Sequence, residues 1–248
     1  VPLYVYIRRP GWKAIAALTG GSLLALALAG VAFWGIYGSL VGKVFDPRSV
    51  ALVQQLESMR PGVTAHVYPL SILNEAALFF AYGFLWFIPN VQWMSVDLRP
   101  AFPLGFGSWQ HLLGAAGYVA LFFAAIWMVL RRRNALAAVG LFLLFPLIWF
   151  MTEFATVWVQ DPFVLYRSYL WAVAVPGLIA IALTGFKPRT IYTAGIVLAL
   201  VFGALALERM ASLKDDGTAW ADAAEKIDTK APANAVGRSR PFLNLGAY

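Results

Sequence analysis

The sequence predicts an all-α fold, a polytopic membrane helix bundle, and three observations lead to this fold class. Of the 248 residues, 61% are hydrophobic and only 12% are charged, whereas soluble domains average roughly 45–50% apolar and about 25% charged residues. So few polar residues cannot cover the surface of a soluble globular domain. Several uncharged apolar stretches are also close to the ~20 residues that a helix needs to cross the bilayer core. Five of them are predicted spans, at 14–42, 112–130, 135–152, 168–186 and 190–207.

A sixth apolar stretch, at 70–89, decides the topology because Asn74 and Glu75 interrupt it. If this stretch does not cross, one side of the membrane holds eight basic residues and none of the twelve acids: Arg8, Arg9, Lys13, Arg131, Arg132, Arg133, Lys187 and Arg189. Basic loops stay in the cytoplasm, so we expect a cytoplasmic N-terminus and an extracytoplasmic C-terminus. Residues 70–89, which are rich in aromatic rings, are then an interfacial or re-entrant helix. The alternative is a sixth, tilted span with Glu75 buried against a partner.

The composition changes after residue 207 and divides the chain into two regions. Residues 1–207 form the predicted transmembrane region, whereas residues 208–248 are rich in Asp, Glu and Lys and form an extracytoplasmic tail. Within the tail, residues 220–227 are predicted to form a short amphipathic helix. Residues 240–248 begin another apolar rhythm after a loop.

The loop between the third and fourth predicted spans carries the main candidate site. It contains Glu153 and Asp161, and Arg167 stands at the mouth of the fourth span between Tyr166 and Tyr169. An Arg at the membrane face can hold a phosphate with its planar fork of donors, and the two Tyr residues can stack or donate hydrogen bonds. The alternative is that Arg167 only anchors the helix end, by reaching to the interface or by pairing with Asp161.

A second polar cluster follows the sixth apolar stretch. Asp97 and Arg99 lie in a proline-bracketed loop, where they form either part of a polar cleft that faces Arg167 or an ordinary surface ion pair. No P-loop, GxGxxG or HExxH motif is present, and the chain has no Cys. The two histidines, His66 and His111, stand 45 residues apart, so no metal site is expected.

Three pieces of the chain, in this order, resemble a known family. They are HVYPLSILNEAALFFAYGFLWFIPNVQWMSVDLRP at 66–100, QDPFVLYRSYLW at 160–171, and a tail with TAWADAAEKI at 218–227 and RPFLNLGAY at 240–248. Together they are similar to bacterial relatives of the TMTC-type membrane protein O-glycosyltransferases of the GT-C superfamily. Such proteins carry tetratricopeptide repeats after the membrane part, and LNLGAY at 243–248 resembles the first helix of a repeat. We therefore expect the tail to continue into helical repeats.

The resemblance implies an enzyme of the bacterial inner membrane that moves a sugar from a polyprenyl-phosphate carrier to a protein hydroxyl on the extracytoplasmic side. Its partners would be membrane lipid, the lipid-linked sugar and the acceptor protein, with no nucleic acid, no cofactor and no divalent metal. Arg167, Tyr166 and Tyr169 would hold the lipid phosphate, with Arg99 and Asp97 as further substrate-binding residues.

The family's general base lies in an acidic loop that has no counterpart in these residues. The resemblance therefore implies that this loop lies upstream of Val1 and that the chain is the C-terminal membrane half of such an enzyme. Glu153 and Asp161 are the possible substitutes for the missing base. The competing hypothesis is a non-catalytic membrane scaffold that binds other membrane subunits. A transporter fits worst, because the last four predicted spans contain no ionisable Asp, Glu, His, Lys or Arg, which transport pathways usually need.

Overall fold

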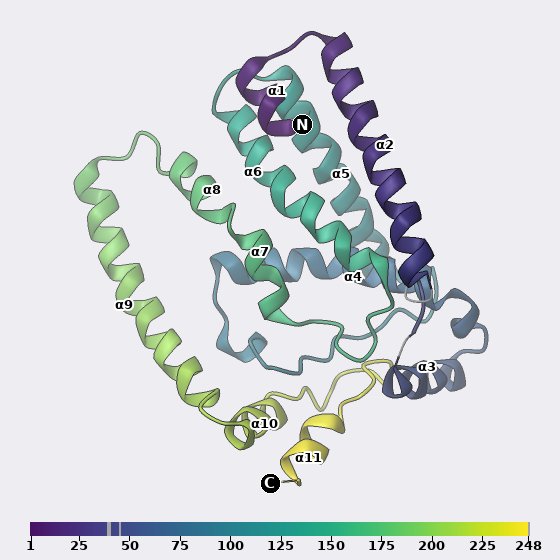
Figure 1. The fold of residues 1–248 in the computed structure, drawn as a ribbon. Coiled ribbons are helices and arrows are strands. Elements are labelled where there is room, and N and C mark those ends of the chain that lie inside the picture. The colour runs from purple at the N-terminus through teal and green to yellow at the C-terminus, as the bar shows by residue number, and fades with distance from the viewer. Residues whose placement is uncertain (39–40, 45, 248) are drawn as a thin grey trace.

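The computed structural model describes residues 1–38, 41–44 and 46–247, and every regular element in these ranges is helical. Five helices are long and apolar enough to cross a membrane, which identifies the chain as a multi-pass membrane protein. The predicted all-α helix bundle is therefore confirmed (Figure 1). The helices that pass this test are α2 (Trp12–Tyr37), α4 (Val63–Phe87), α5 (Trp109–Arg131), α6 (Ala135–Phe150, extended by the 3-10 helix η2, Met151–Ala155) and α9 (Pro188–Ser212).

The core of the bundle is the α5–α6 hairpin with α4 packed against it. Glycines allow the helices to approach closely: a Cβ at Gly114 would lie 2.5 Å from the Cα of Ala77, and one at Gly140 would lie 2.7 Å from the carbonyl oxygen of Ala125. Aromatic rings fill the space between the three helices. The Phe79 ring meets the rings of Tyr118 and Phe150 edge-on at 5.2 and 5.1 Å. Such edge-to-face pairs stabilise a core beyond the area that they bury.

Helix α4 runs crosswise to α5 and α6 rather than alongside them (Figure 1). It begins at Val63, earlier than the predicted start at residue 70, because the helix continues through Pro69. Half of its most apolar window is buried inside the bundle. Its interfacial position in the membrane stays a prediction, which the crosswise arrangement favours.

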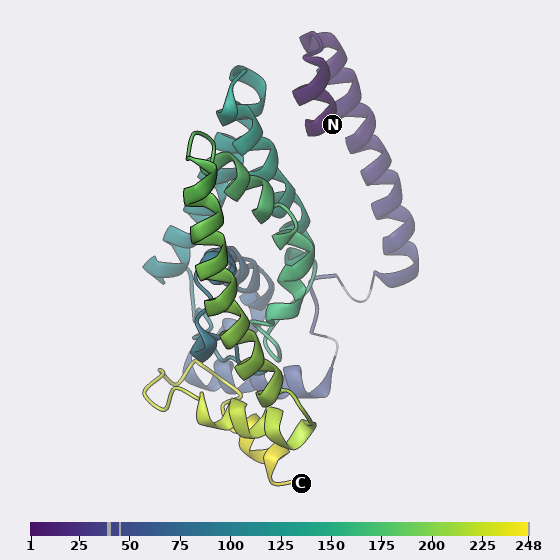
Figure 2. The same cartoon turned by 90° about the vertical axis from the view of Figure 1, so that its left-hand side faces the viewer.

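Two N-terminal helices stand at the edge of this bundle. The short α1 (Pro2–Arg8) places Val5 in the core, and the following Arg9 turns the chain with a left-handed φ of 47°. Arg9 also donates a hydrogen bond to the carbonyl of Val129 at the end of α5. Helix α2 buries none of its most apolar window and stands apart from the other long helices (Figure 2). At the predicted span 14–42 the helix ends early, at Tyr37, and residues 39–40 of this span lie outside the described ranges.

The predicted span at 168–186 is not one straight helix in the structure. The chain forms the 3-10 helix η3 (Leu165–Ser168), α7 (Tyr169–Ala172) and α8 (Val175–Ala182), with a 56° bend between 165–172 and 175–182. The cause is Pro176, which has no N–H to donate to the carbonyl of Ala172 and therefore interrupts the helical ladder. This segment is a broken span or a re-entrant loop.

The remaining elements gather at one end of the molecule (Figure 1). Helix α3 (Pro47–Met59) is capped by Asp46, and the 3-10 helix η1 (Val91–Trp93) follows α4. In the tail, α10 (Asp216–Glu225) begins with a capping box between Asp215 and Thr218, and α11 (Arg240–Leu245) packs against it. Both tail helices were expected near these positions, whereas α3 was not predicted.

The tail also returns to the loop that follows η1. The backbone N–H of Phe102 donates to the carbonyl of Asn234 at 3.0 Å, and the Asn234 side-chain amide donates back to the carbonyl of Phe102 at 2.7 Å. This reciprocal pair joins residues that are 132 positions apart. The loop and the tail therefore form one folded unit at this end of the bundle.

Candidate functional site

Arg167 lies on η3 and pairs with Glu153 rather than with Asp161. Its Nη1 is 3.3 Å from Glu153 Oε2, and the two side chains are only 12% and 9% exposed. The guanidinium carbon lies 3.7 Å from the centre of the Trp158 ring, which is a cation–π contact. The indole N–H of Trp158 in turn donates to the carbonyl of Glu153 at 3.0 Å. Arg167 is therefore held in an enclosed cluster and does not extend freely into the lipid.

Two polar side chains of α4 lie next to this ion pair. Asn74 and Glu75 are 1% and 0% exposed, and the Asn74 amide donates to Glu75 Oε1 at 3.4 Å. Among the residues that the structure describes, Glu75 Oε2 and Asn74 Oδ1 have no hydrogen-bond partner. Glu75 is within electrostatic range of both Glu153 and Arg167, so one cation faces two carboxyl groups. In the sequence, Glu75 stands inside an apolar stretch, and an ionisable residue inside a membrane segment is by default a candidate functional residue.

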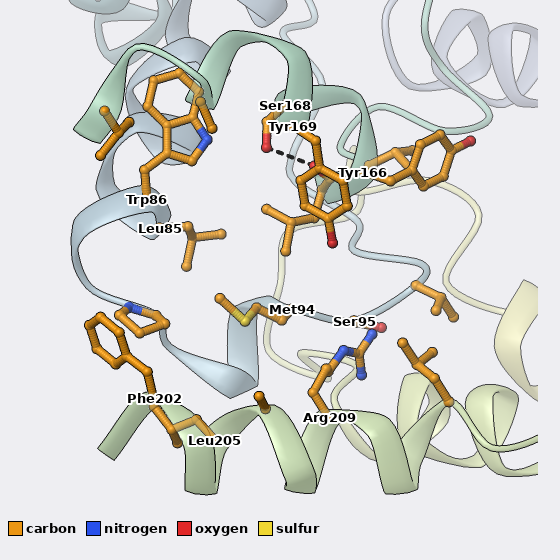
Figure 3. A pocket seen from close by; sticks show the side chains of 18 of the residues that line it. Leu85, Trp86, Met94, Ser95, Tyr166, Ser168, Tyr169, Phe202, Leu205 and Arg209 are labelled. Carbon is orange, nitrogen blue, oxygen red and sulfur yellow. Dashed lines mark hydrogen bonds between the residues drawn. The ribbon is translucent and has the colours of Figure 1, made fainter. Parts of the chain in front are cut away.

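Tyr166 and Tyr169 line a different space, of which Arg167 is not a lining residue. This pocket has a volume of about 650 Å³ and lies between the end of α4, residues 94–96, the bent α7–α8 segment and α9. Both Tyr side chains are 68% exposed. In Figure 3 Tyr169 points into this space from one wall, Tyr166 extends sideways along that wall, and Phe202 and Arg209 of α9 rise from the facing wall. Most of the lining is apolar, so we name this space the membrane pocket.

Arg209 is the cation of the membrane pocket. Its Nη1 donates to Ser212 Oγ at 2.9 Å and to Asp222 Oδ2 at 2.7 Å. The other oxygen of Asp222 is 2.6 Å from Lys226 Nζ, so this carboxylate is shared between two cations. Both side-chain bonds that Arg209 makes within the described residues use Nη1, so its Nε and Nη2 have no partner there and can bind a ligand. The sequence analysis did not select Arg209, although a cation just beyond a predicted span was a usable signal.

Asp97 and Arg99 form a buried ion pair and not a surface pair. Arg99 Nη2 is 2.5 Å from Asp97 Oδ1, and each side chain is 2% exposed. Arg240 of α11 covers the pair: it bonds Asp161 and lies 3.6 Å from Asp97 Oδ1. Burial raises the pKa of the Asp97 carboxyl above its ordinary value, against the opposing effect of Arg99. Among the residues that the structure describes, no ion pair joins this network to Arg167.

The structure therefore separates the predicted site residues into three groups. Glu153 and Arg167 belong to the enclosed cluster beside α4, Tyr166 and Tyr169 belong to the membrane pocket, and Asp97, Arg99 and Asp161 belong to a network that fastens the tail. Comparison with known proteins adds no assignment, since no family model, curated protein or solved structure matches the chain.

Proposed function

We propose that the chain is an integral membrane glycosyltransferase, or the C-terminal half of one, that takes a sugar from a polyprenyl-phosphate carrier. The sugar is passed to a protein hydroxyl on the extracytoplasmic side of the bacterial inner membrane. The observation that supports this proposal best is the membrane pocket, because it joins a long apolar wall to a polar end. An isoprenoid chain and a phosphate need these two environments side by side.

The apolar wall suits the isoprenoid chain. Leu85, Val175, Phe202 and Leu205 come from three helices and line the same space. Its volume of about 650 Å³ is within the roughly 300–1,000 Å³ of typical small-molecule sites. The remainder of a longer polyprenyl chain would leave the pocket into the bilayer, since α9 buries none of its most apolar window.

The polar end suits the phosphate. Arg209 extends from the last turns of α9 toward Ser95, with the Tyr169 hydroxyl facing it from the opposite wall (Figure 3). A guanidinium with unused donors can bind a phosphate with charge-assisted hydrogen bonds. In this proposal Arg209 takes the role that the sequence analysis gave to Arg167, whereas Tyr166 and Tyr169 keep theirs.

Of the groups that the reaction needs, the general base has the weakest candidates among these residues. A base must reach the acceptor hydroxyl and take its proton. Glu153 is paired with Arg167, and Asp161 is paired with Arg240, so either carboxylate would have to leave an ion pair first. The proposal therefore concerns the binding of the lipid-linked donor and assigns the general base to neither of these carboxylates.

The test is binding of a polyprenyl monophosphate to the purified protein in nanodiscs, followed by native mass spectrometry. Arg209→Gln should weaken binding about 10- to 150-fold, because a charge-assisted hydrogen bond contributes about 1.5–3 kcal/mol. The matched control is Arg189→Gln, which removes an exposed cation from the other end of the same helix and should leave binding unchanged. Asp222→Asn breaks the ion pair but keeps the cation, so it should also retain binding.

Two outcomes would contradict the proposal. Equal losses in Arg209→Gln and Arg189→Gln would mean that only the overall charge attracts the lipid. If the wild-type protein binds no polyprenyl phosphate, the proposed donor is wrong and the competing hypothesis of a non-catalytic scaffold remains. If binding is confirmed, transfer of the sugar to an acceptor protein in membranes, with and without Arg209, tests the enzymatic step itself.

A further inference from the structure

Helix α2 stands apart from the other long helices (Figure 2), and an apolar cleft lies between its first half and the walls formed by α1, α5 and α6. The cleft has a volume of about 510 Å³ and shares no lining residue with the membrane pocket. We name this space the α2 cleft. On α2 it is lined by residues of one helix face, Ile15, Thr19, Ser22, Leu23 and Leu26.

We propose that the α2 cleft binds one anionic phospholipid of the surrounding bilayer. An acyl chain lies between α2 and the α5–α6 hairpin, and the phosphate lies at Arg131 and Arg9. This inference does not rest on the proposed function, because it concerns a different lipid at a different place. Three features carry it: the length of the cleft, the loose packing of α2, and cations without acids at one end.

The length of the cleft fits one leaflet of a bilayer. Its lining on α2 runs from Ile15 to Leu26, and these eleven residue steps rise about 17 Å along a helix. The hydrocarbon core is about 30 Å thick, so one leaflet accounts for about 15 Å of it. A membrane-spanning helix of a partner would need the whole thickness. An acyl chain from one leaflet is therefore the better fit.

Helix α2 does not pack closely on its neighbours. In membrane proteins, small residues allow helix backbones to approach each other, as Gly114 and Gly140 do in the core of this bundle. At Gly20 and Gly21 of α2, by contrast, an added Cβ would meet no atom of another helix within 4 Å. Apolar surfaces are not driven together in lipid, so association depends on close packing. A lipid chain that fills the cleft supplies the packing that direct helix contact does not.

Two cations stand at one end of the cleft. Arg131 directly follows the lining residue Leu130, and its guanidinium carbon lies 5.7 Å from the centre of the Trp12 ring at the start of α2. Arg9 donates through Nη1 to the carbonyl of Val129, which also lines the cleft. A guanidinium that stacks on a ring keeps the N–H groups in its plane for a ligand. Both cations can therefore reach a phosphate whose acyl chain enters the cleft.

The charge around this end favours an anionic headgroup. Helices α1, α2, α5 and α6, with the α1–α2 and α5–α6 connections, contain no Asp or Glu. Within the described residues, none of their six cations is in an ion pair. Basic pockets between membrane helices on the cytoplasmic side bind anionic headgroups. The preference of basic loops for the cytoplasm explains the sign of this charge, but not its place at the end of an apolar cleft. The six cations are Arg8, Arg9, Lys13, Arg131, Arg132 and Arg133.

The experiment is native mass spectrometry of the purified protein in mixed detergent micelles, titrated with phosphatidylglycerol or with phosphatidylcholine of the same acyl chains. Wild-type protein should retain one phosphatidylglycerol and bind it about 25-fold more tightly, because each of two cations contributes about fivefold. Arg131→Gln should weaken phosphatidylglycerol binding about fivefold for the same reason. The matched control is Arg189→Gln, which removes an exposed Arg at the start of α9, also predicted to be cytoplasmic, and should bind as wild type does.

A second pair of variants tests the acyl chain. Ser22→Phe fills the cleft from α2 and should weaken binding at least about tenfold, because each CH₂ group that stays buried contributes about fourfold. Ala17→Phe adds the same ring to α2 outside the cleft and should bind as wild type does. If Ser22→Phe fails to fold, phosphatidylglycerol with a photoreactive group in its acyl chain locates the lipid on the wild-type protein. Its cross-links should fall on residues 12–26 and 122–130.

Four results would overturn the inference: no phospholipid bound by wild-type protein, equal binding of the two phospholipids, equal losses in Arg131→Gln and Arg189→Gln, or cross-links confined to other helices. Its failure can be told apart from failure of the proposed function. Arg209→Gln should lose polyprenyl phosphate and keep phosphatidylglycerol, because Arg209 does not line the α2 cleft. Arg131→Gln should do the reverse, and displacement of phosphatidylglycerol from the cleft by polyprenyl phosphate would contradict a separate site.

Discussion

Replacing Arg167 with Gln should destabilise the bundle strongly, because Arg167 is the cation between two enclosed carboxyl groups. Glu153 lies 3.3 Å from it, and Glu75 is within electrostatic range. The change keeps a long polar side chain but removes the charge. It therefore leaves Glu153 without its ion-pair partner in a place where water hardly reaches, since its side chain is only 9% exposed.

The expected loss follows from the burial of the pair. Breaking a buried ion pair by removing one partner costs about 3–5 kcal/mol of unfolding free energy. The stacking of the guanidinium on Trp158 is lost as well, and such a contact contributes about 2 kcal/mol where it is desolvated. These two costs overlap, so we expect a total of about 3–5 kcal/mol. The double variant Glu153→Gln/Arg167→Gln leaves no unpaired charge at this pair and should recover at least about 2 kcal/mol of that loss.

Unfolding in mixed detergent micelles, followed by tryptophan fluorescence, measures these differences. Arg189→Gln is the control, because Arg189 is exposed at the start of α9 and should change stability by no more than about 0.5 kcal/mol. The reasoning is refuted if Arg167→Gln is as stable as that control. It is also refuted if the losses of the two single variants simply add in the double variant, because the ion pair would then contribute nothing.

Two further predictions concern topology and pH. Cysteines placed at the exposed Gln110 and Lys214 should react with an impermeant reagent from outside intact cells, whereas one at Arg133 should not; labelling at Arg133 would contradict the orientation. The carboxylate of Glu57 accepts hydrogen bonds from the N–H groups of Gly62 and Thr64, and chiefly the Thr64 bond lowers the pKa of Glu57 below the ordinary 4.5. Its stabilising effect on the start of α4 is therefore fully present above about pH 4.5 and lost as pH falls through the lowered value. Carbon NMR of the Glu57 carboxyl should give a titration midpoint below 4.5, and a midpoint at or above 4.5 would contradict this assignment.

The helices of the hairpin were predictable because their signals are local. The predicted spans 112–130 and 135–152 differ from α5 and α6 by a few residues, and Asn134 caps the start of α6 with its side chain. The start of α4 was missed because proline is expected in the first turn of a helix. In the structure Pro69 is the seventh residue of α4, so the helix begins about two turns before the predicted start at residue 70.

The separation of Arg167 from Tyr166 and Tyr169 could also have been predicted from the sequence. Residues three apart share a face of a helix, so Tyr166 and Tyr169 lie together, whereas Arg167 is turned by about 120° from Tyr166 in the 3-10 helix η3. The contacts of the tail could not be predicted from the sequence. The pairing of Arg240 with Asp161 spans 79 positions, and no local pattern indicates which of several acids a distant cation will meet.

The reciprocal bonds between Phe102 and Asn234 have a consequence for the timing of folding during synthesis. The two residues are 132 positions apart, and a ribosome that adds about 5–20 residues per second needs about 7–26 s to cover that distance. Throughout this interval the loop after η1 has left the ribosome without the partner that covers it. Its backbone groups and the Asp97–Arg99 pair are therefore open to proteases and chaperones until the tail arrives, which makes this loop the late-closing part of the nascent protein.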